Sequence, residues 1–404
     1  MSRRPRLLVL NQYYAPGLEA TAHLLGDLCV ALADEFDITV VTGRLQIPPV
    51  DAGRTVEDGV EVIRVNSTAY ERRRLWLRAV NYVTYLLQSF RASLRVERPD
   101  IVLCMTDPPI IGNVALAVAR RFRAPLIVVS QDVFPEIAVR LRRLENPLLI
   151  AVLRALIAYY LRRADRVVAI GETMRMRLIE KGAPPTRVHV IPNWIDTTAL
   201  VPAERNNEWA REHGLDGRFV VMHSGNIGHA QNLDALIRSA TFLRDLERLT
   251  ILLIGGGARW DEFTALAELL EVDAVRFLPY QPREVLTQSL SAADIHVVGL
   301  ARGLGGYVVP SRLYGILAVG RPVIVAADEE TETAQVVRES GCGIVVPPGR
   351  PELLAAVIRQ AYDGELPLEE MGRRAREHVV AAEERALAVG RYRALLHELL
   401  EESD

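Results

Sequence analysis

The chain has 404 residues, of which half are hydrophobic and a quarter are charged. A globular chain of this length exceeds one hydrophobic core and is expected to form two domains of about 200 residues each. The formal net charge is −3, and neither half has the strong basic excess or the aromatic platforms of nucleic-acid-binding proteins, which excludes that class.

Charge is unevenly distributed along the chain. The first 200 residues hold 27 basic and 20 acidic residues, a charge of +7, and the remainder holds 21 and 31, a charge of −10. This asymmetry indicates that the first half meets something anionic, although surface charge is often only solvated. Lys181 is the only lysine among 48 basic residues, and we attribute the preference for arginine to genomic bias.

The cysteines Cys29, Cys104 and Cys342 are far apart and lack the spacing of metal ligands, so a reducing cytoplasmic environment is expected. Only four apolar residues follow the basic first residues, too few for a signal peptide. No stretch reaches the roughly 18 uncharged apolar residues of a membrane span. Residues 148–161 come nearest and are interrupted by Arg154. We therefore expect a protein that is soluble or peripheral.

The first part of the chain alternates short β-rich segments with longer helical ones, the pattern of a parallel sheet covered by helices. Helices are expected from about Thr21 to Asp34 and from Gly112. Seven strands with helical crossovers predict one doubly wound α/β domain over residues 1–195, followed by a polar linker at 196–207. The expected strands are residues 7–11, 38–43, 60–66, 101–106, 125–130, 166–171 and 188–193.

The same alternation restarts after the linker and predicts a second α/β domain over residues 208–384. Helical segments begin at Arg350 and near Pro367. Residues 385–404 are expected to form a last amphipathic helix, whose leucine spacing requires a packing surface that could be the first domain. The expected strands are residues 219–226, 249–257, 275–280, 294–300, 322–327 and 343–348.

The stretch PSRLYGILAVGRPVIV, residues 310–325, predicts a loop, a helix, a turn and a buried strand. Pro310 and Ser311 indicate the helix start, with a serine side chain able to cap free backbone N–H groups. Arg312 lies in the first turn, and Gly320 ends the helix. A helix start beside an arginine is suited to a phosphate, and a helix that only packs on the sheet fits this segment equally well.

Ligands of open α/β sheets bind outside the carboxyl ends of the strands, and two sheets in tandem can face a common central cleft. The segment SGNIGHAQNL follows an expected strand and opens a helix. Gly225, Asn226 and Gly228 can therefore present backbone N–H groups to an anion.

Gly256 and Gly257 can do likewise after the next strand, although neither glycine segment matches a dinucleotide fingerprint. Tyr280 could hold a planar base, and the loop that contains Tyr307 leads into Arg312. One nucleotide site assembled from several loops is therefore expected.

Three positions of the first domain could carry chemistry. Gly17 permits a tight turn and close ligand approach after the first strand. Glu19 could place a carboxylate at the mouth of the cleft or serve as an ordinary first-turn helix acid. Asp132 follows an apolar strand directly and could act in catalysis or cap a helix.

A tightly bound metal is not expected. No pair of aspartates one residue apart follows a strand, and no histidine or cysteine cluster has ligand spacing. The charge of a diphosphate would then have to be met by Arg312 and by helix N-termini.

Five motifs stand in the order of a known family, and the chain resembles a GT-B glycosyltransferase of the retaining family 4 over essentially its whole length. The match is closest to the bacterial subgroup resembling N-acetyl-fucosamine transferases of cell-surface polysaccharide assembly. The motifs are NQYYAPGLEATA, SQDVFPE, IPNWID, SGNIGHAQNL and PSRLYGILAVGRPVI. The resemblance implies two Rossmann-like domains, a UDP-sugar donor held mainly by the second, an acceptor held by the first, and retention of configuration without a bound metal.

The resemblance also places residues in roles. Ser311, Arg312 and Leu313 would contact the donor. Many members carry two glutamates eight positions apart ahead of the helix, at the places where this chain has Tyr307 and Gly315, so the ribose must be held in another way.

Three further departures concern the donor diphosphate and the catalytic acid. Asn226 and Gln231 stand where many members have an arginine and a lysine on the diphosphate. Asp132 replaces a histidine and Glu19 a glycine, so either acid could face the sugar.

Residues 72–90 and 140–163 place arginines beside aromatic and aliphatic residues, which suits an anionic membrane surface, although much of this apolar surface must be core. The resemblance adds a lipid-linked sugar as a plausible acceptor, which implies a peripheral position at the inner face of the cell membrane. Two alternatives stay open: a nucleotide-sugar 2-epimerase on the same scaffold, and a non-catalytic nucleotide-sugar binding protein.

Overall fold

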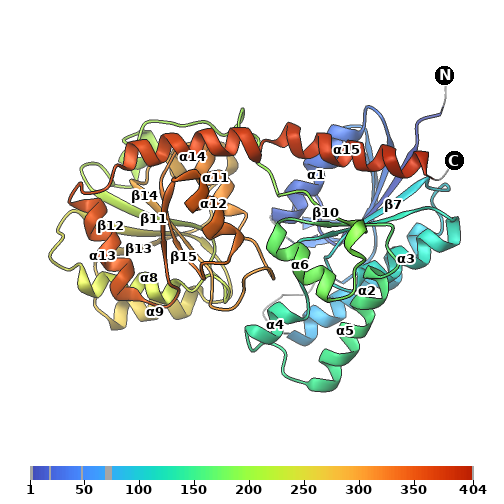
Figure 1. The fold of residues 1–404 in the computed structure, drawn as a ribbon, viewed down its shortest axis with the longest axis horizontal. Coiled ribbons are helices and arrows are strands. Elements are labelled where there is room, and N and C mark those ends of the chain that lie inside the picture. Colours follow the sequence, from blue (N-terminus) through green and yellow to red (C-terminus); the bar gives the residue numbers. More distant parts are fainter. Residues whose placement is uncertain (1–2, 18–19, 47–48, 69–74, 403–404) are drawn as a thin grey trace. The chain divides into compact units, whose positions relative to one another are not determined.

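The computed structural model describes residues 3–17, 20–46, 49–68 and 75–402. It divides the chain into two compact units, each built around its own parallel sheet (Figure 1). The first unit contains Met1–Asn193, Gly306–Val308 and Ala386–Asp404, and the second contains Trp194–Gly305 and Val309–Arg385. Both are α/β units with Rossmann-like strand order.

In the described part of the chain, the sheet of the first unit has eight strands in the order β10-β9-β8-β7-β1-β2-β6-β5. Its central strands are short, fully buried apolar segments such as LIVVS, as expected for a parallel sheet with helices on both faces. A two-stranded ribbon, β3 (Leu45–Gln46) and β4 (Pro49–Val50), stands apart from it. The eight strands are β1 (Arg6–Leu10), β2 (Asp37–Thr42), β5 (Gly53–Glu57), β6 (Val60–Arg64), β7 (Ile101–Met105), β8 (Leu126–Ser130), β9 (Arg166–Ala169) and β10 (Val188–Val190).

The prediction of seven strands in this domain is wrong: within the described residues its sheet has an eighth strand, β5, and the ribbon strands β3 and β4 were not predicted either. Strand β5 was missed because its sequence, GRTVE, is largely exposed and has no apolar run. It pairs antiparallel with β6 at the sheet edge. The two strands are joined by Asp58 and Gly59, both with positive φ, and an Asp-Gly pair between strands is a strong hairpin signal.

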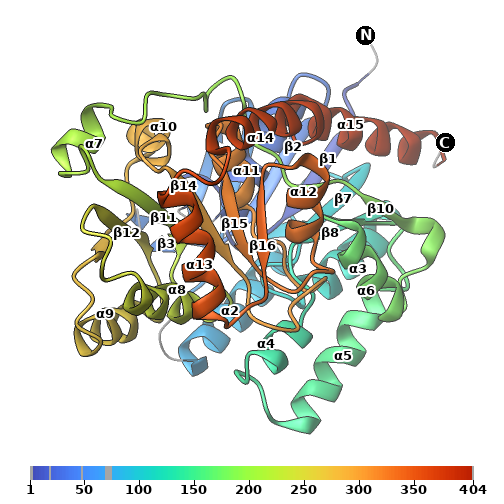
Figure 2. The same ribbon diagram turned by 60° about the vertical axis from the view of Figure 1, so that its left-hand side comes forward.

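The helices of the first unit cover the sheet and its edges, and α5 extends away from the sheet (Figures 1 and 2). Tyr160 of α5 is buried against Gly112 of α3, where a Cβ atom would collide with the tyrosine ring. The helices are α1 (Ala20–Leu32), α2 (Leu75–Ser93), α3 (Ile111–Phe122), α4 (Glu136–Arg140), α5 (Pro147–Leu161), α6 (Glu172–Glu180) and the 3₁₀ turn η1 (Pro185–Arg187).

The second unit has a six-stranded parallel sheet in the order β13-β12-β11-β14-β15-β16 within the described residues. This is the doubly wound order in which the first and fourth strands are neighbours, and ligands bind where the order reverses. All six strands predicted for this domain are confirmed. They are β11 (Phe219–Asn226), β12 (Leu249–Gly256), β13 (Val275–Leu278), β14 (Ile295–Gly299), β15 (Val323–Ala326) and β16 (Gly343–Val346).

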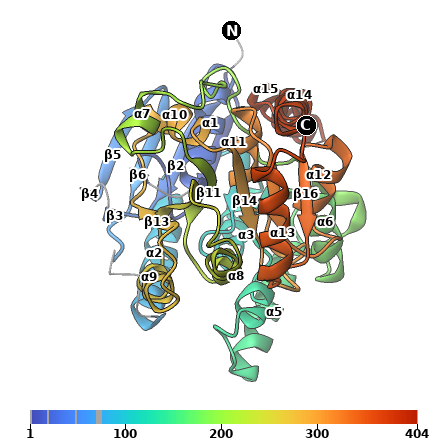
Figure 3. The ribbon, with the colours of Figure 1, turned by 90° about the vertical axis from the view of Figure 1, so that its left-hand side faces the viewer.

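Helices cover both faces of this sheet (Figure 3). On one face α8, α9 and α13 pack on the strands in a shared apolar core, and on the other a smaller core includes residues of α7 and the two alanines that follow α10. The helices are α7 (Glu208–Glu212), α8 (Leu233–Ser239), α9 (Trp260–Leu269), α10 (Leu286–Ser291), α11 (Arg312–Ala318), α12 (Glu332–Ser340), α13 (Pro351–Tyr362), α14 (Leu368–Ala382) and α15 (Arg385–Glu401), with 3₁₀ turns η2 (Ala240–Phe242) and η3 (Arg283–Val285).

From Ala386 onward, α15 belongs to the first unit. It buries a stripe of residues that includes Tyr392 and Leu396. Ion pairs fix both of its halves: Arg393 Nε lies 2.6 Å from the carboxylate of Glu35, and Arg166 lies 2.7 Å from Glu398.

The stretch from Pro310 to Val325 folds as predicted in its order of elements: α11, a turn at Gly320 with φ +65°, and β15. The predicted capping role of Ser311 is wrong. Its dihedral angles (φ −61°, ψ −19°) are helical, and its side chain makes no capping hydrogen bond. An N-cap side chain reaches the free N–H groups from an extended backbone, which Ser311 does not have.

A buried histidine of the second unit predicts acid sensitivity. His296 on β14 is fully buried, with Nε2 2.9 Å from the carbonyl oxygen of Leu290, and burial lowers its pKa to about 4 from the usual 6.5. Because the unfolded chain binds a proton here that the folded chain does not, stability is lost as the pH falls from 6.5 toward 4, by roughly 3 kcal/mol. Urea denaturation near pH 7 and pH 4.5 should show a weaker pH dependence for His296→Leu, and an unchanged one would contradict this assignment.

Candidate active site

The carboxyl ends of β11 and β12 and the loops that follow them are in close contact, and glycines make this possible. A Cβ atom at Gly255, where φ is +147°, would overlap the carbonyl oxygen of Gly225, and one at Gly257 would overlap that of Ile227. The Ile227 N–H donates to the carbonyl oxygen of Gly256 (2.9 Å). This contact shapes the carboxyl end of the sheet at its first two strands.

Two amides converge beside this contact. The backbone N–H of Gly228 donates to Oε1 of Gln231 at 3.1 Å. A Cβ atom at Gly228 would lie 2.9 Å from Nδ2 of Asn226 and 3.0 Å from Oε1 of Gln231. Asn226 is exposed and Gln231 half-buried, so both side chains can offer polar atoms to a ligand.

Arg312 at the start of α11 reaches the same loops. Its guanidinium lies 3.2 Å from Nε2 of buried His223, and a Cβ atom at Gly225 would be 3.7 Å from its Cδ. Burial lowers the pKa of Arg312 to about 10, so it is still cationic at neutral pH. Burial and the arginine charge keep the pKa of His223 well below its usual value, so this partner is neutral. Within the described residues, Arg312 forms no ion pair with a carboxylate.

Tyr280 completes the cluster with a flat, partly exposed ring. Its hydroxyl donates to the carbonyl oxygen of Gly256 at 3.2 Å, and its ring would lie 3.2 Å from a Cβ atom there. Burial raises the pKa of Tyr280, and the charge of Arg312 partly offsets this effect. These residues supply a cation that is not paired with a carboxylate in the described part of the chain, two amides and a flat ring. Together they suit a ligand in which a diphosphate is attached to a planar base.

The loops of the first unit hold the predicted acid. Asp132 follows β8, is exposed, and pairs through its backbone with Val308. Ser130 Oγ donates to the carbonyl oxygen of Asp132 (3.1 Å). Buried Gln131 beside it exchanges two amide hydrogen bonds, of 3.1 and 2.9 Å, with Asn193, which ties the β8 loop to the segment after β10. The backbone that carries Asp132 is therefore fixed.

The sequence matches two known domain families, one in each half of the chain. Residues 17–194 match the Glycosyl transferase 4-like domain, and residues 205–378 match Glycosyl transferases group 1. The chain is a two-domain GT-B glycosyltransferase of family 4.

Relatives support this assignment over the whole length. The chain is 26% identical to the probable glycosyltransferase WbjE of Pseudomonas aeruginosa, covering 98% of this chain and 99% of WbjE. It is 32% identical to the putative colanic acid biosynthesis glycosyl transferase WcaI of Escherichia coli over half of each chain.

Two solved structures share the fold. The sucrose-phosphate synthase of Thermosynechococcus elongatus has a TM-score of 0.81 at 16% identity, covering 99% of this chain and all of that one. HepE of Anabaena, in complex with UDP-glucose, has a TM-score of 0.75 at 14% identity, covering 97% and 99%.

The structure places the other predicted site residues of this glycosyltransferase as follows. Gly17 is buried, with its N–H donating to the carbonyl oxygen of Tyr14 (3.0 Å), and Glu19 lies outside the described residues. Ser311 is half-buried beside Arg312. The side chain of Leu313 is buried in the core, and its N–H donates to the carbonyl oxygen of Pro310 (3.2 Å).

Tyr307 was predicted among the donor-binding residues, but it belongs to the first unit. The guanidinium carbon atoms of Arg140 and Arg177 lie over its ring, 4.6 and 4.9 Å from the ring centroid. Its hydroxyl accepts a hydrogen bond from Arg140 (3.2 Å). Its place among the donor-binding residues therefore stays a prediction.

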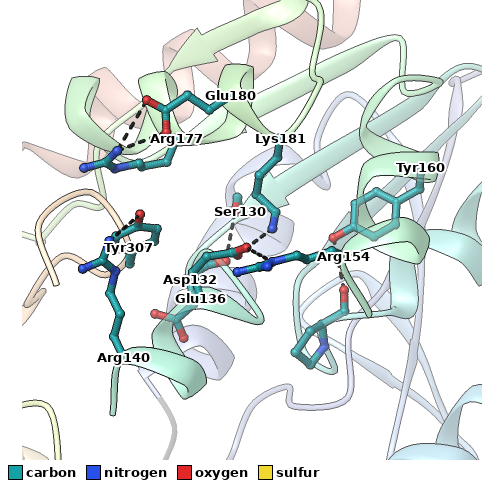
Figure 4. Close-up of polar contacts among 11 residues, drawn as sticks. Ser130, Asp132, Glu136, Arg140, Arg154, Tyr160, Arg177, Glu180, Lys181 and Tyr307 are labelled. Carbon is teal, nitrogen blue, oxygen red and sulfur yellow. Dashed lines mark hydrogen bonds and ion pairs between the residues drawn. The ribbon is translucent and has the colours of Figure 1, made fainter. Parts of the chain in front are cut away.

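Sequence reasoning missed four charged residues of the first unit, Glu136, Arg154, Arg177 and Lys181. Glu136 lies between Lys181, at 2.5 Å, and Arg154, at 3.0 Å (Figure 4). Burial alone would raise the pKa of Glu136, but hydrogen bonds from these two cations outweigh it and lower the pKa. The sequence feature that could have indicated this cluster was Lys181, because it is the only lysine of the sequence.

The glycine contact predicts a local stability effect. Gly257→Ala is expected to lower the free energy of unfolding by about 1–3 kcal/mol, because a methyl group must displace the Ile227 carbonyl and the Asn226 amide at φ +156°. Gly390→Ala on α15 is the matched control. Its added methyl group meets nothing within 4 Å and should stabilise the helix by about 0.5–1 kcal/mol. Urea unfolding of both variants checks the pair, and equal effects would contradict the close contact.

Proposed function

We propose that this glycosyltransferase moves a sugar, an N-acetylated hexosamine or deoxyhexosamine, from a UDP-sugar to a cell-envelope or lipid-linked glycan, with retention of configuration and without a bound metal. The observation that carries the proposal is Arg312, a half-buried cation whose hydrogen-bond partner is a neutral histidine. A cation held in this way can neutralise the charge that develops on a departing diphosphate.

The relatives favour transfer over the alternatives. HepE has been solved with UDP and with UDP-glucose, and WcaI is named for colanic acid biosynthesis. Both matching domain families are glycosyltransferase domains, so transfer is favoured over a nucleotide-sugar 2-epimerase and over a non-catalytic binding protein.

Retention is proposed to proceed on one face of the donor sugar. The acceptor hydroxyl attacks the anomeric carbon on the face from which UDP leaves, and its proton passes to the departing phosphate oxygen. Arg312 would stabilise the charge on that phosphate, Tyr280 would contact the base, and Asn226 and Gln231 would hold polar groups of the donor. Asp132 would orient the acceptor hydroxyl, with Glu19 as the other candidate.

A coupled assay tests the reaction. UDP release should require both a UDP-sugar from a panel of N-acetylated sugars and an acceptor with a lipid-linked sugar, and it should persist in EDTA. The anomeric configuration of the product, read from the NMR coupling constant, should match that of the donor. Turnover of the donor alone would indicate the epimerase, and UDP binding without release would indicate the binding protein.

Membrane association is proposed to occur through α5. The described residues contain no helix long and apolar enough to cross a bilayer. However, Leu148 is 74% exposed on α5, with Val152 and Tyr159 exposed one and three turns further along. Exposed arginines, Arg142 and Arg143, precede the helix. An apolar stripe beside basic residues suits the surface of an anionic bilayer.

Vesicle co-sedimentation tests this surface. The enzyme is expected to sediment with vesicles containing anionic lipid at low salt, and the Leu148→Glu, Val152→Glu double variant should lose at least about tenfold in affinity. Leu269→Glu, at an 80% exposed leucine of the second unit, is the control and should bind normally. Failure of the unmodified enzyme to sediment under these conditions would end the membrane proposal.

A further inference from the structure

A pocket of about 320 Å³ lies in the first unit. This volume is within the range of small-ligand sites. Its walls come from α4, α5, α6 and the segment that carries Tyr307 (Figure 4). Its lining residues are Glu136, Arg154, Ala158, Arg177, Glu180, Lys181 and Tyr307.

The pocket is cationic. With Arg140, which lies against Tyr307, the described charged groups around it are four cations and two carboxylates, a net charge of +2. Glu136 contacts both Lys181 and Arg154 and can neutralise only one of them. The pair of Arg177 and Glu180 is 36% and 59% exposed, so water screens it and a stronger anion can displace it.

Lys181 connects this pocket to the candidate acid. It also lines a small adjoining cavity, whose other walls include Ser130 and Asp132. Its side chain is only 11% exposed, and its ammonium group is a compact charge with three donors.

Helix α5 joins the pocket to an apolar surface. Arg154 and Ala158, one turn apart, face the pocket. Leu148 and Val152, also one turn apart, are exposed on another side of the helix. In Figure 2 the helix extends from the sheet of this unit, and Leu148 and Val152 are 74% and 47% exposed.

We propose that this pocket binds the phosphate or diphosphate group of the acceptor, which places the acceptor's sugar near Asp132. The proposal rests on the proposed function and identifies the acceptor class as a phosphorylated one. The phosphate can belong to a lipid, whose hydrocarbon would lie along the apolar side of α5, or to a soluble sugar phosphate. Arg154, Arg177 and Lys181 would donate charge-assisted hydrogen bonds to its oxygens.

Binding of inorganic pyrophosphate to the full chain in saturating UDP tests the pocket, because UDP occupies the diphosphate site at Arg312. Isothermal titration should show that Lys181→Met and Arg177→Gln each weaken pyrophosphate binding about tenfold or more, the effect of losing one charge-assisted hydrogen bond. Arg143→Gln removes the same charge from an exposed position of the same unit and should bind as the unmodified enzyme does. Equal affinity in all four proteins would overturn the proposal.

Two further measurements separate the possible outcomes. The Lys181→Met, Glu136→Gln double variant removes both charges of the pair, so weak pyrophosphate binding by this variant with a normal melting temperature excludes a folding defect as the cause. If UDP itself does not bind, the proposed function fails, and the same titration on Arg312→Ala still tests the pocket. If farnesyl diphosphate binds more tightly than glucose 1-phosphate and farnesol does not bind, the phosphate belongs to a lipid. If glucose 1-phosphate binds more tightly, the phosphate belongs to a soluble sugar phosphate.

Discussion

Replacing Arg312 by alanine is expected to lower kcat by about 100- to 1,000-fold, the usual effect of removing one group that stabilises developing negative charge. The reason is that the guanidinium lies beside neutral His223 and forms no ion pair with an acid in the described part of the chain, so its charge is available to the donor diphosphate. Steady-state kinetics with a saturating acceptor measure the effect, and UDP affinity from calorimetry shows how much of it is ground-state binding.

Two further variants make this result specific. Arg312→Lys keeps the charge but loses the planar fork and should recover part of the lost rate. Arg373→Ala removes an exposed arginine from α14 of the same unit, where it pairs with Glu370, and should leave kcat unchanged. Near-normal turnover of Arg312→Ala would remove this residue from the mechanism.

Asp132→Asn is expected to lower kcat by about 100-fold or more, because a neutral amide holds the acceptor hydroxyl in a weaker hydrogen bond than a carboxylate does and orients it less well. The substitution is nearly isosteric and leaves the backbone pairing with Val308 intact, so the fold should be unaffected. Rates at saturating donor and acceptor measure the chemical step, and an unchanged KM for the donor would locate the defect on the acceptor side.

The comparison that decides between the two acids is Glu19→Gln. If Asp132→Asn turns over normally and Glu19→Gln does not, the catalytic role passes to Glu19. Glu145→Gln, an exposed acid in the same unit, should behave as the unmodified enzyme and controls for a general change in charge.

The arrangement of strands could be predicted because each central strand is a short apolar run buried on both faces. Short apolar segments such as LIVVS of β8 and VIVA of β15, each followed by a polar loop, predict buried strands. Strand β5 was not predicted, because most of its residues are exposed and its position depends on the Asp58-Gly59 turn. The helix start at Arg312 was predicted, but the capping of Ser311 depends on dihedral angles that a sequence pattern does not specify.

The candidate site was predictable in the second unit and much less so in the first. Asn226 and Gly256 end strands of one sheet and Tyr280 and Arg312 follow strands of the same sheet, so topology alone brings them together. The cationic pocket instead joins three helices to Tyr307, which is 126 residues after Lys181 in the sequence. No local sequence pattern predicts that these distant residues lie together, and arginines beside glutamates on helices are too common to indicate a site.

The assignment of α15 to the first unit has a consequence for biosynthesis. That unit needs Ala386–Asp404 in addition to Met1–Asn193, whereas the second unit lies within Trp194–Arg385. During translation, the ribosome therefore releases all of the second unit before it releases the last helix of the first. We expect a chain that ends at Arg385 to carry a protease-resistant second unit, while the first unit acquires full protection only when α15 is present.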